Sequence, residues 1–365
     1  MNTDTPRIFI AATQQNAGKT TTALGLYSAL HATFRRIGFI KPVGQRFLEI
    51  DGKKVDEDSV LIRSTFDTQT SIEDMSPIAV EPDFTRRYIN RANHEGLSRR
   101  IQHAFDRAAW EKDFVIIEGT GHAGVGSVFD LSNARVAKLL QSKVVIVTEG
   151  GIGRPIDEIA LNTALFDREE VEVVGVIMNK VLPDKLEYIG DFARRGLERL
   201  GLELIGIMPA EPILDDPTLE EVRLLVRGTF LCGESEKGTN AGEILIGAMT
   251  SSNLVERLRN RALVITPGDR EDMVLAALSV AQCEREMVCG IVLSDGFLPH
   301  ARVLELLREV DLPVIASPLD SYEIASRIES MTVKTQPGDL AKISRIQEMT
   351  AGGIQVDRLL EKLGC

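Results

Sequence analysis

The sequence predicts an α/β protein with a doubly wound, mostly parallel sheet, followed by a smaller α/β domain. Three observations predict it. Short β-branched runs repeatedly precede amphipathic stretches of helix length, the runs are almost continuously apolar, and a Gly-Lys-Thr sequence follows the first run directly. The alternation indicates parallel strands joined by crossover helices, and the apolar runs indicate strands covered on both faces.

The strands of the first domain are expected in chain order at Ile8–Ile10, Ile37–Ile40, Phe114–Ile117, Val144–Val147 and Val173–Ile177. In sheets of this kind, ligands bind at the carboxyl ends of the strands. Polar residues that follow these runs are therefore the first candidates for a functional site.

A proline-rich, acidic stretch at 209–217 cannot continue a helix and predicts a domain boundary. We expect an ATP-binding domain over 1–215, a second domain over 216–335 and a helical tail over 336–365. In the second domain we expect helices from about Leu219 and Arg270, and strands at Ile244–Ile246, Ala262–Ile265, Gly290–Leu293 and Pro313–Ala316. The tail has two short amphipathic stretches around Gly352-Gly353, and its packing partner is not predictable.

The composition excludes several functional classes. A net charge of -12 disfavours nucleic acid as a partner, and arginine pairs such as Arg99/Arg100 are interpreted as solvated surface. No apolar run is long enough to span a membrane and no secretion signal opens the chain, so we expect a cytoplasmic protein. The four cysteines show no zinc or disulfide spacing.

The stretch Thr13–Thr20 has the order of a P-loop, with a strand before it and a helix after it. Gly18 allows close approach of the backbone, Lys19 supplies a mobile positive charge, and the Thr20 hydroxyl can bind Mg²⁺. Thr13 stands where the pattern has its first glycine. The residues predicted to bind ATP with Mg²⁺ are Thr13, Asn16, Ala17, Gly18, Lys19, Thr20 and Thr21.

Other polar residues follow the remaining strands. Glu118 follows an apolar run and can hold Mg²⁺, and Asp58 is a further candidate ligand for the metal. Lys41 follows the second strand and can neutralise a substrate carboxylate or a transferring phosphoryl group. The amide of Asn179 can read an adenine edge. His122 can be a general base or a loop hydrogen-bonding residue.

These residues together resemble dethiobiotin synthetase, and the similar domain of long bacterial phosphotransacetylases, over about residues 6–212. The resemblance implies phosphate binding by Ala12–Thr20, magnesium ligation by Asp58 and Glu118, adenine recognition by Asn179, a substrate role for Lys41, and a homodimer. Gln45 replaces the serine of the family's Lys-Pro-Val-x-Ser, and His122-Ala123 follows Glu-Gly-x-Gly. Both changes argue against the family's diaminononanoate substrate.

Residues 217–330 resemble a DRTGG domain, the module that follows the same ATPase-like domain in long phosphotransacetylases. Asp269-Arg270 matches the motif, but Glu271-Asp272 replaces its Thr-Gly. The segment Thr266–Arg270 is interpreted equally well as a ligand loop or as a strand-to-helix turn with an N-capping aspartate.

Two functions remain open. In the first, the protein is an ATPase or phosphotransfer enzyme in which Lys19 and Lys41 act on ATP and an unidentified small carboxylate. In the second, it is a nucleotide-sensing regulatory protein whose second domain carries the output. The length of the sequence leaves no room for a phosphotransacetylase catalytic domain, so we do not expect that activity.

Overall fold

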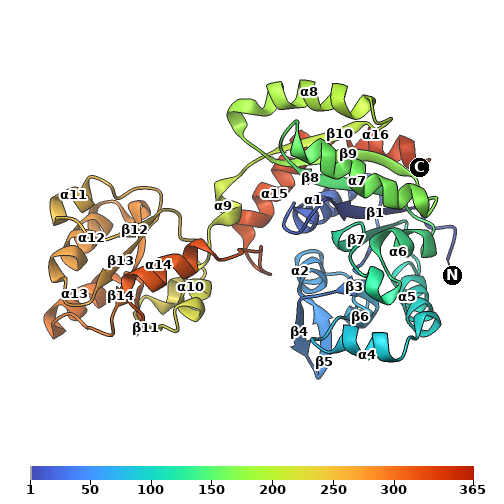
Figure 1. Cartoon of the computed structure of the whole chain (residues 1–365). Helices are drawn as coiled ribbons and strands as arrows, with labels where there is room; N and C mark the ends of the chain where they lie inside the picture. The colour runs from blue at the N-terminus through green and yellow to red at the C-terminus, as the bar shows by residue number, and fades with distance from the viewer. Residues whose placement is uncertain (1) are drawn as a thin grey trace. The chain divides into compact units, whose positions relative to one another are not determined.

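The computed structural model describes residues 2–365 and divides the chain into two compact units. Unit 1 comprises the chain up to Ala210 together with Gln336–Cys365, and unit 2 comprises Glu211–Thr335. Unit 2 is thus inserted in the sequence of unit 1, which resumes with the C-terminal helices (Figure 1).

Unit 1 is built on a six-stranded sheet in which every neighbouring pair is parallel. The strand order is β10-β9-β8-β1-β7-β2. The strands are β1 (Arg7–Ala12), β2 (Ile37–Ile40), β7 (Phe114–His122), β8 (Lys143–Glu149), β9 (Val173–Val181) and β10 (Leu204–Pro209). From β1 the chain passes to β2 and then to β7, which lie on one side of β1 in the sheet. It then crosses to the other side of β1 to form β8. This reversal places the end of β1 at the switch point of the sheet, where such folds bind ligands.

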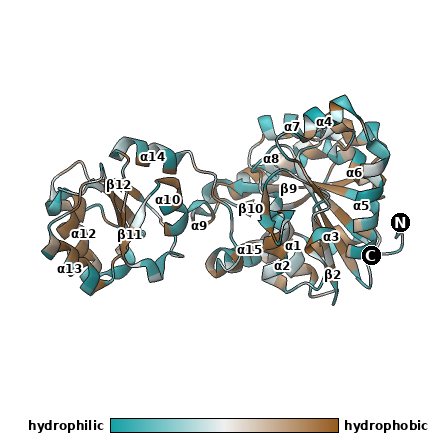
Figure 2. Ribbon diagram, turned by 90° about the horizontal axis from the view of Figure 1, so that it is seen from below, coloured by the Kyte–Doolittle hydropathy of each residue, from teal (hydrophilic) through white to brown (hydrophobic). Residues whose placement is uncertain are grey.

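Helices cover the sheet of unit 1, and the strands form its apolar interior (Figure 2). The helices are α1 (Lys19–Leu30), α2 (Glu57–Phe66), α3 (Ile72–Met75), α4 (Phe84–Asn90), α5 (His94–Ala108), α6 (Asn133–Leu139), α7 (Arg154–Arg168) and α8 (Leu186–Glu198). All six residues of β1 are buried, as the near-continuous apolar sequence predicts. Phe9 and Val115 belong to a core that extends to Phe166 on α7 and Leu197 on α8.

Two small sheets lie between β2 and α5 in the sequence. β3 (Val43–Gly44) pairs with β6 (Ile78–Ala79) in parallel, and β4 (Phe47–Ile50) forms an antiparallel hairpin with β5 (Lys53–Asp56). The hairpin turn is Asp51-Gly52, with φ values of 51° and 74°. Two left-handed residues are what a two-residue hairpin turn of this twist requires.

The C-terminal helices α15 (Leu340–Gly353) and α16 (Val356–Leu363) belong to unit 1. α15 packs along α1, and both C-terminal helices, α15 and α16, contact β10. The helix–helix contact is close because Gly25 lacks a side chain: a Cβ there would lie 1.8 Å from Thr350 Oγ1. Gly353 is inside the last turn of α15, where a Cβ would lie 2.5 Å from the carbonyl oxygen of Ile207.

Unit 2 has a five-stranded sheet in the order β11-β15-β14-β13-β12. β12 (Ile244–Ile246), β13 (Ala262–Pro267), β14 (Val288–Ser294) and β15 (Val314–Ala316) are parallel, and β11 (Thr229–Cys232) is an antiparallel edge strand. The helices are α9 (Pro212–Asp215), α10 (Leu219–Leu225), α11 (Ser251–Val255), α12 (Glu271–Cys283), α13 (Ala301–Val310) and α14 (Ser321–Glu329). Two apolar clusters form its core, one of them centred on Val264 and Ile291.

The fold class and every strand expected from the sequence are confirmed. One edge strand of each main sheet, β10 in unit 1 and β11 in unit 2, was not predicted, and neither were the strands β3 to β6 of the two small sheets. The glycine pair Gly352-Gly353 lies in the last turn of α15, and only Gly353 is at the tight approach to β10, since a Cβ on Gly352 would meet no atom within 4 Å.

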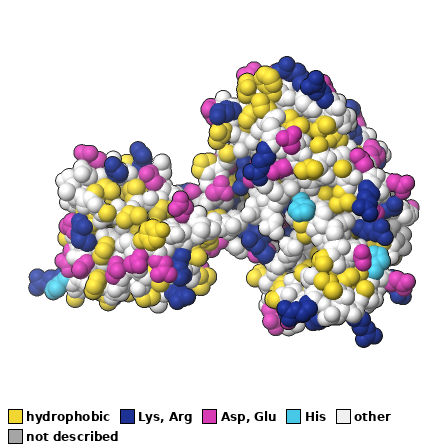
Figure 3. Space-filling model, viewed as in Figure 1, with side chains coloured by type: hydrophobic (Ala, Val, Ile, Leu, Met, Phe, Trp, Pro, Cys, Tyr) yellow, Lys and Arg dark blue, Asp and Glu magenta, His cyan; other side chains and the backbone are white. Residues whose placement is uncertain are grey.

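The surface carries mixed charge. Acidic and basic side chains are interspersed over the visible face of each unit, with no basic stripe there (Figure 3). Among residues 2–365 no helix is long and apolar enough to cross a membrane. The four cysteines are free thiols, and Cys289 is buried.

Candidate functional site

The loop between β1 and α1 has the shape expected of a phosphate-binding loop. Asn16 and Gly18 have φ values of 60° and 100°, so the chain enters the left-handed region twice within three residues. Loops that alternate in this way turn successive N–H groups toward one point, where they bind anions. The N–H of Thr13 is bonded to the carbonyl of Val147 on β8 at 3.0 Å, which anchors the start of the loop.

Gly18 is required here for two reasons. Its φ disfavours any other residue, and a Cβ would lie 1.9 Å from Asn179 Nδ2. Asn179, at the end of β9, is buried and donates to the carbonyl of Ala17 at 3.2 Å. The structure therefore places Asn179 directly under the P-loop, with its amide donor engaged by the loop backbone.

Lys19 begins α1 and is buried. Its ammonium donates to the carbonyl of Gly121 at 3.2 Å and approaches that of Gln14 at 3.5 Å. Gly121 follows Glu118 on β7, so the lysine connects the loop to the neighbouring strand. Carbonyl oxygens are weak partners for a buried cation, and a bound phosphate would replace them with full negative charge.

Thr20 and Glu118 meet next to the lysine. The Thr20 hydroxyl donates to Glu118 Oε1 at 3.0 Å. Glu118 is completely buried and pairs with Ile10 of β1, before the irregularity that lets β7 continue to His122. The sequence suggested that Glu118 lies at the end of the strand, but the structure places it inside β7. Thr21, the next helical residue, is partly exposed.

Lys41 lies immediately after β2 and is enclosed by three carboxylates. Its Nζ lies 3.2 Å from Asp56 Oδ1 and 3.5 Å from Glu118 Oε1, and it is also paired with Asp58. All four side chains are buried. Asp58 comes from the first turn of α2, and Asp56 is the N-cap of the same helix, accepting from the N–H of Asp58 at 3.0 Å.

The charges of this cluster shift one another. Burial raises the pKa of Glu118 to about 7 and that of Asp56 to about 6, against the lowering effect of Lys41 in both cases. For Lys41, burial opposes the charged form, but Glu118, Asp58 and Asp56 outweigh it and its pKa is raised well above the ordinary value. The lysine is therefore charged and holds the acids together.

The residues fit a magnesium site. Glu118 Oε2 and Asp56 Oδ2 are buried and have no hydrogen-bond partner. Unsatisfied carboxylate oxygens beside a threonine hydroxyl are the oxygen ligands that Mg²⁺ prefers. Within residues 2–365 no three acidic, histidine or cysteine side chains are already spaced around a metal position, and in this cluster the Lys41 ammonium supplies the positive charge.

Two buried asparagines of the site were not predicted. Asn162 on α7 accepts from the N–H of Ala123 at 2.7 Å and donates to the carbonyl of Thr13 at 3.4 Å. Asn133 on α6 accepts from the N–H of Thr120 at 3.0 Å and donates to the carbonyl of His122 at 2.6 Å. Asn162 joins the loop after β7 to the P-loop, and Asn133 joins the end of β7 to α6. No local pattern distinguishes them from surface asparagines.

His122 and Arg154 lie at the exposed rim of the site. The ring of His122 accepts from the N–H of Gly124 at 3.2 Å, the loop hydrogen bond that was one of its two interpretations. Arg154, at the start of α7, donates to the side chain of Gln14 at 2.9 Å and to Glu158. Arg154 is thus an unpredicted cation next to the P-loop.

In unit 2, the segment Thr266–Arg270 forms a turn from β13 to α12. The N-cap position is Arg270, so the expectation of an N-capping aspartate at Asp269 is wrong. The guanidinium of Arg270 pairs with Asp272 in the first turn, at 2.8 Å, and donates to the carbonyl of Met249. α12 therefore begins one residue later than an N-capping Asp269 would require.

Comparison with known families agrees with this geometry. A protein-family model described as an AAA domain, AAA_26, matches residues 6–218, more than half of the 365-residue chain. The chain belongs to the AAA_26 family. A DRTGG domain model matches residues 221–331 of this AAA_26 protein. The resemblance to a P-loop domain joined to a DRTGG domain is therefore confirmed.

The relatives of this AAA_26 protein include long phosphate acetyltransferases. That of Pseudomonas aeruginosa is 28% identical over 373 residues, covering 98% of this chain and 52% of the relative. That of Synechocystis is 24% identical over 378 residues, with coverage of 98% and 52%. The chain spans about half the length of these relatives.

Among solved structures, similarity is limited to the general fold. The MinC:MinD cell division complex of Aquifex aeolicus matches at 15% identity and a TM-score of 0.37, covering 57% of this chain and 83% of that one. The CBS and DRTGG domains of Clostridium perfringens pyrophosphatase, complexed with diadenosine tetraphosphate, match at 16% identity and a TM-score of 0.29, with coverage of 45% and 78%.

Proposed function

We propose that this protein binds Mg-ATP at Thr13–Thr20 and transfers or hydrolyses the γ-phosphoryl group. The observation that supports this most strongly is the convergence of Lys19, Thr20, Lys41 and Glu118 at the switch point of the sheet. These groups come from three different elements, and phosphoryl transfer needs little from a protein beyond such positioned charge.

In the proposed complex, Lys19 leaves the carbonyls of Gln14 and Gly121 and contacts the β- and γ-phosphates. Thr20 and Glu118 hold Mg²⁺, with Asp58 as a further ligand, and the ion neutralises charge on the phosphates. A bound cation would favour the ionised form of Glu118 and so oppose the effect of burial on its pKa. Asn16, Ala17 and Thr21 belong to the nucleotide site through the loop backbone and the first turn of α1.

Lys41 has the second role in the proposal. If Glu118 and Asp58 held Mg²⁺, the ammonium of Lys41 would have fewer carboxylate partners and would be able to attract the acceptor. A small carboxylate is the acceptor that suits a lysine at this position. Asn179 on β9 donates to the loop carbonyl of Ala17, and we propose that it orients the loop and faces the base. A homodimer is part of the proposal through the resemblance alone.

The test is calorimetric titration of the full chain with Mg-ATP, followed by phosphate-release measurements on the same samples. Lys19→Ala is the test variant, and Lys138→Ala, an exposed lysine paired with Glu170, is the matched control. We expect Lys19→Ala to weaken binding by more than about tenfold and Lys138→Ala by less than about twofold. Absence of binding to the wild type, or equal binding by both variants, would overturn the proposal. Turnover that rises with a small carboxylate would identify the acceptor class.

A nucleotide-sensing protein is the second candidate, and the packing of α15 favours it. α15 directly follows unit 2 in the sequence and packs along α1, which begins at Lys19 and Thr20. A change at the P-loop could therefore alter the helix that carries the end of unit 2, provided that two conformations differ in nucleotide affinity. Tight Mg-ATP binding without phosphate release would decide for this candidate.

A further inference from the structure

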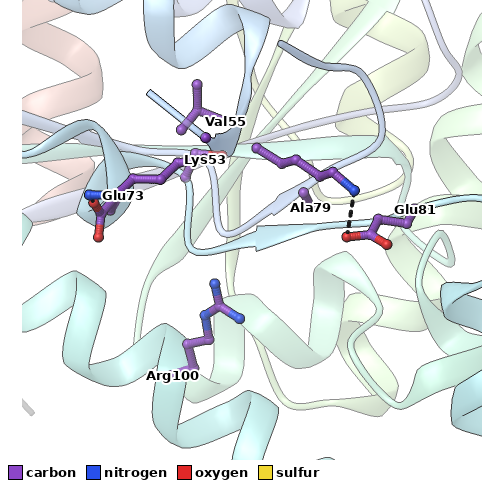
Figure 4. A pocket seen from close by; sticks show the side chains of 9 residues that line it. Lys53, Val55, Glu73, Ala79, Glu81 and Arg100 are labelled. Carbon is purple, nitrogen blue, oxygen red and sulfur yellow. Dashed lines mark ion pairs between the residues drawn. The ribbon is translucent and has the colours of Figure 1, made fainter. Parts of the chain in front are cut away.

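Unit 1 contains a polar cavity that no P-loop residue lines. It has a volume of about 380 Å³ and lies between the β4–β5 hairpin, α3, β6 and α5. Its lining residues are Gly52, Lys53, Lys54, Val55, Glu73, Ser76, Ala79, Glu81 and Arg100 (Figure 4). No residue of the nucleotide site lines this cavity. Its volume is within the range of small-ligand pockets, about 300–1,000 Å³.

The cavity has more positive than negative charge. Lys53 pairs with Glu73, and Lys54 pairs with Glu81 at 3.0 Å, the contact dashed in Figure 4. Glu81 is already shared, because Arg87 on α4 lies 3.3 Å from its other oxygen. The hydrogen bond from Lys54 lowers the pKa of Glu81, so this carboxylate is ionised and satisfied.

Arg100 is the cation left over. Within residues 2–365 it forms no ion pair or side-chain hydrogen bond, whereas the preceding Arg99 pairs with Glu95 at 3.3 Å. Figure 4 shows the Arg100 side chain extending from α5 toward the hairpin, with its guanidinium directed into the cavity. The two members of this arginine pair therefore have different surroundings, and only one of them is satisfied by its own helix.

Three cations and two carboxylates line the cavity, and Arg87, which pairs with Glu81 from outside the lining, brings the local excess to two positive charges, in a protein whose net charge is -12. We propose that the cavity binds a small organic phosphate through Arg100, Lys53 and Lys54. A dianionic phosphate matches the excess charge, and its oxygens match the planar donor fork of a guanidinium. The hydroxyl of Ser76, which accepts from the N–H of Asp56 at 2.8 Å, can donate to the same ligand.

The cavity is connected to the nucleotide site through β5. Lys53, Lys54 and Val55 line the cavity, and the next residue is Asp56, whose carboxylate contacts Lys41. The two sites nevertheless use different side chains. Their ligands can therefore be tested one at a time.

The experiment is calorimetric titration of the full chain with glycerol 3-phosphate at pH 8, where its phosphate is dianionic. Arg100→Gln is the test variant, and Arg99→Gln is the matched control, with the same charge change one residue away on the same helix. Lys19→Ala removes the lysine of the P-loop, the other phosphate-binding element of unit 1. Thermal unfolding of the two arginine variants checks that both remain folded.

We expect millimolar or tighter binding by the wild type and by Lys19→Ala, a loss of about tenfold or more in Arg100→Gln, and a change below about twofold in Arg99→Gln. No binding up to about 10 mM ligand, equal effects of the two arginine variants, or loss of binding in Lys19→Ala would each overturn the proposal. Malate serves as a dicarboxylate probe, and tighter binding of malate would overturn the assignment to a phosphate. None of these outcomes depends on whether ATP is hydrolysed.

Discussion

The Thr20 hydroxyl donates a 3.0 Å hydrogen bond to Glu118 Oε1 and so joins the first turn of α1 to the interior of β7. The contact aligns two oxygen groups from segments almost a hundred residues apart, without any ligand. The other oxygen of the same carboxylate, Glu118 Oε2, is buried and has no hydrogen-bond partner. A magnesium ion entering here would find both ligands on adjacent elements, already close together.

Replacing Thr20 should reduce the contribution of Mg²⁺ to ATP affinity. Thr20→Val removes the hydroxyl while keeping the shape, so we expect the gain in ATP affinity on adding Mg²⁺ to fall by about tenfold. Thr20→Ser keeps the hydroxyl and should stay within about threefold of the wild type. ATP titrations with and without Mg²⁺ measure the difference. An unchanged magnesium effect in Thr20→Val would exclude this ligand.

Removing the charge of Lys41 should destabilise the unliganded protein. Lys41→Met leaves Asp56, Asp58 and Glu118 buried without their cation, and breaking such a cluster costs about 3–5 kcal/mol at neutral pH. Adding Mg²⁺ should recover part of the loss, because the ion replaces the missing charge. Urea unfolding with and without Mg²⁺ tests this. A variant as stable as the wild type would show that the acids are protonated.

Glu118 makes the stability of the metal-free protein depend on pH. Burial raises its pKa from the ordinary 4.5 to about 7, so the folded state retains a proton that the unfolded state has lost. The stabilisation is complete below about pH 4.5 and is lost as the pH rises through about 7. Between pH 5.5 and 8 we expect the wild type to lose on the order of 1–3 kcal/mol more than Glu118→Gln, which has no titrating proton there.

Unfolding in EDTA at several pH values compares the two proteins. Other carboxylates titrate in both, so only the difference between their curves reports on Glu118. Parallel curves would mean that the pKa of Glu118 is not raised in the folded protein.

Alanine substitutions at two helical glycines should change the stability of the protein in opposite directions. At Gly25 on α1 the new Cβ would meet Thr350 of α15 at 1.8 Å, so Gly25→Ala should destabilise the protein by about 1–3 kcal/mol. At Gly190 on α8 the nearest atom is 3.6 Å away, and Gly190→Ala should stabilise by about 0.5–1 kcal/mol through helix propensity. Stabilisation by both substitutions, measured by thermal unfolding, would argue against the α1–α15 contact.

The sequence predicted the central elements because their signals are local. Apolar runs such as Val144–Val147 mark a buried parallel strand without any knowledge of its neighbours, and Gly18-Lys19-Thr20 marks a phosphate loop by its place between a strand and a helix. The edge strands β10 and β11 lack that signal. β10 is interrupted by Gly206, which lies against Gly353 and Ile354, and β11 has only partly buried or exposed residues.

The supporting residues of the site could not be predicted, since they act over long separations in the sequence. Asn162 reaches Thr13 across 149 residues, and nothing in its own neighbourhood indicates this. Asp56 has the same limitation: the run Asp56-Glu57-Asp58 reads as solvated surface. Only the folded chain shows that its first and third members are buried around Lys41, while the side chain of Glu57 is 26% exposed.

The insertion of unit 2 also sets an order of events during synthesis. α1 is among the first helices to leave the ribosome, but α15, which covers Gly25, emerges only after all of unit 2 has been made. During that interval the sheet that carries the P-loop lacks one of its covering helices, and a long chain segment must be closed into a loop before the contact can form. Completion of the P-loop unit is therefore a late event in the biogenesis of this protein, timed by the translation of the unit that interrupts it.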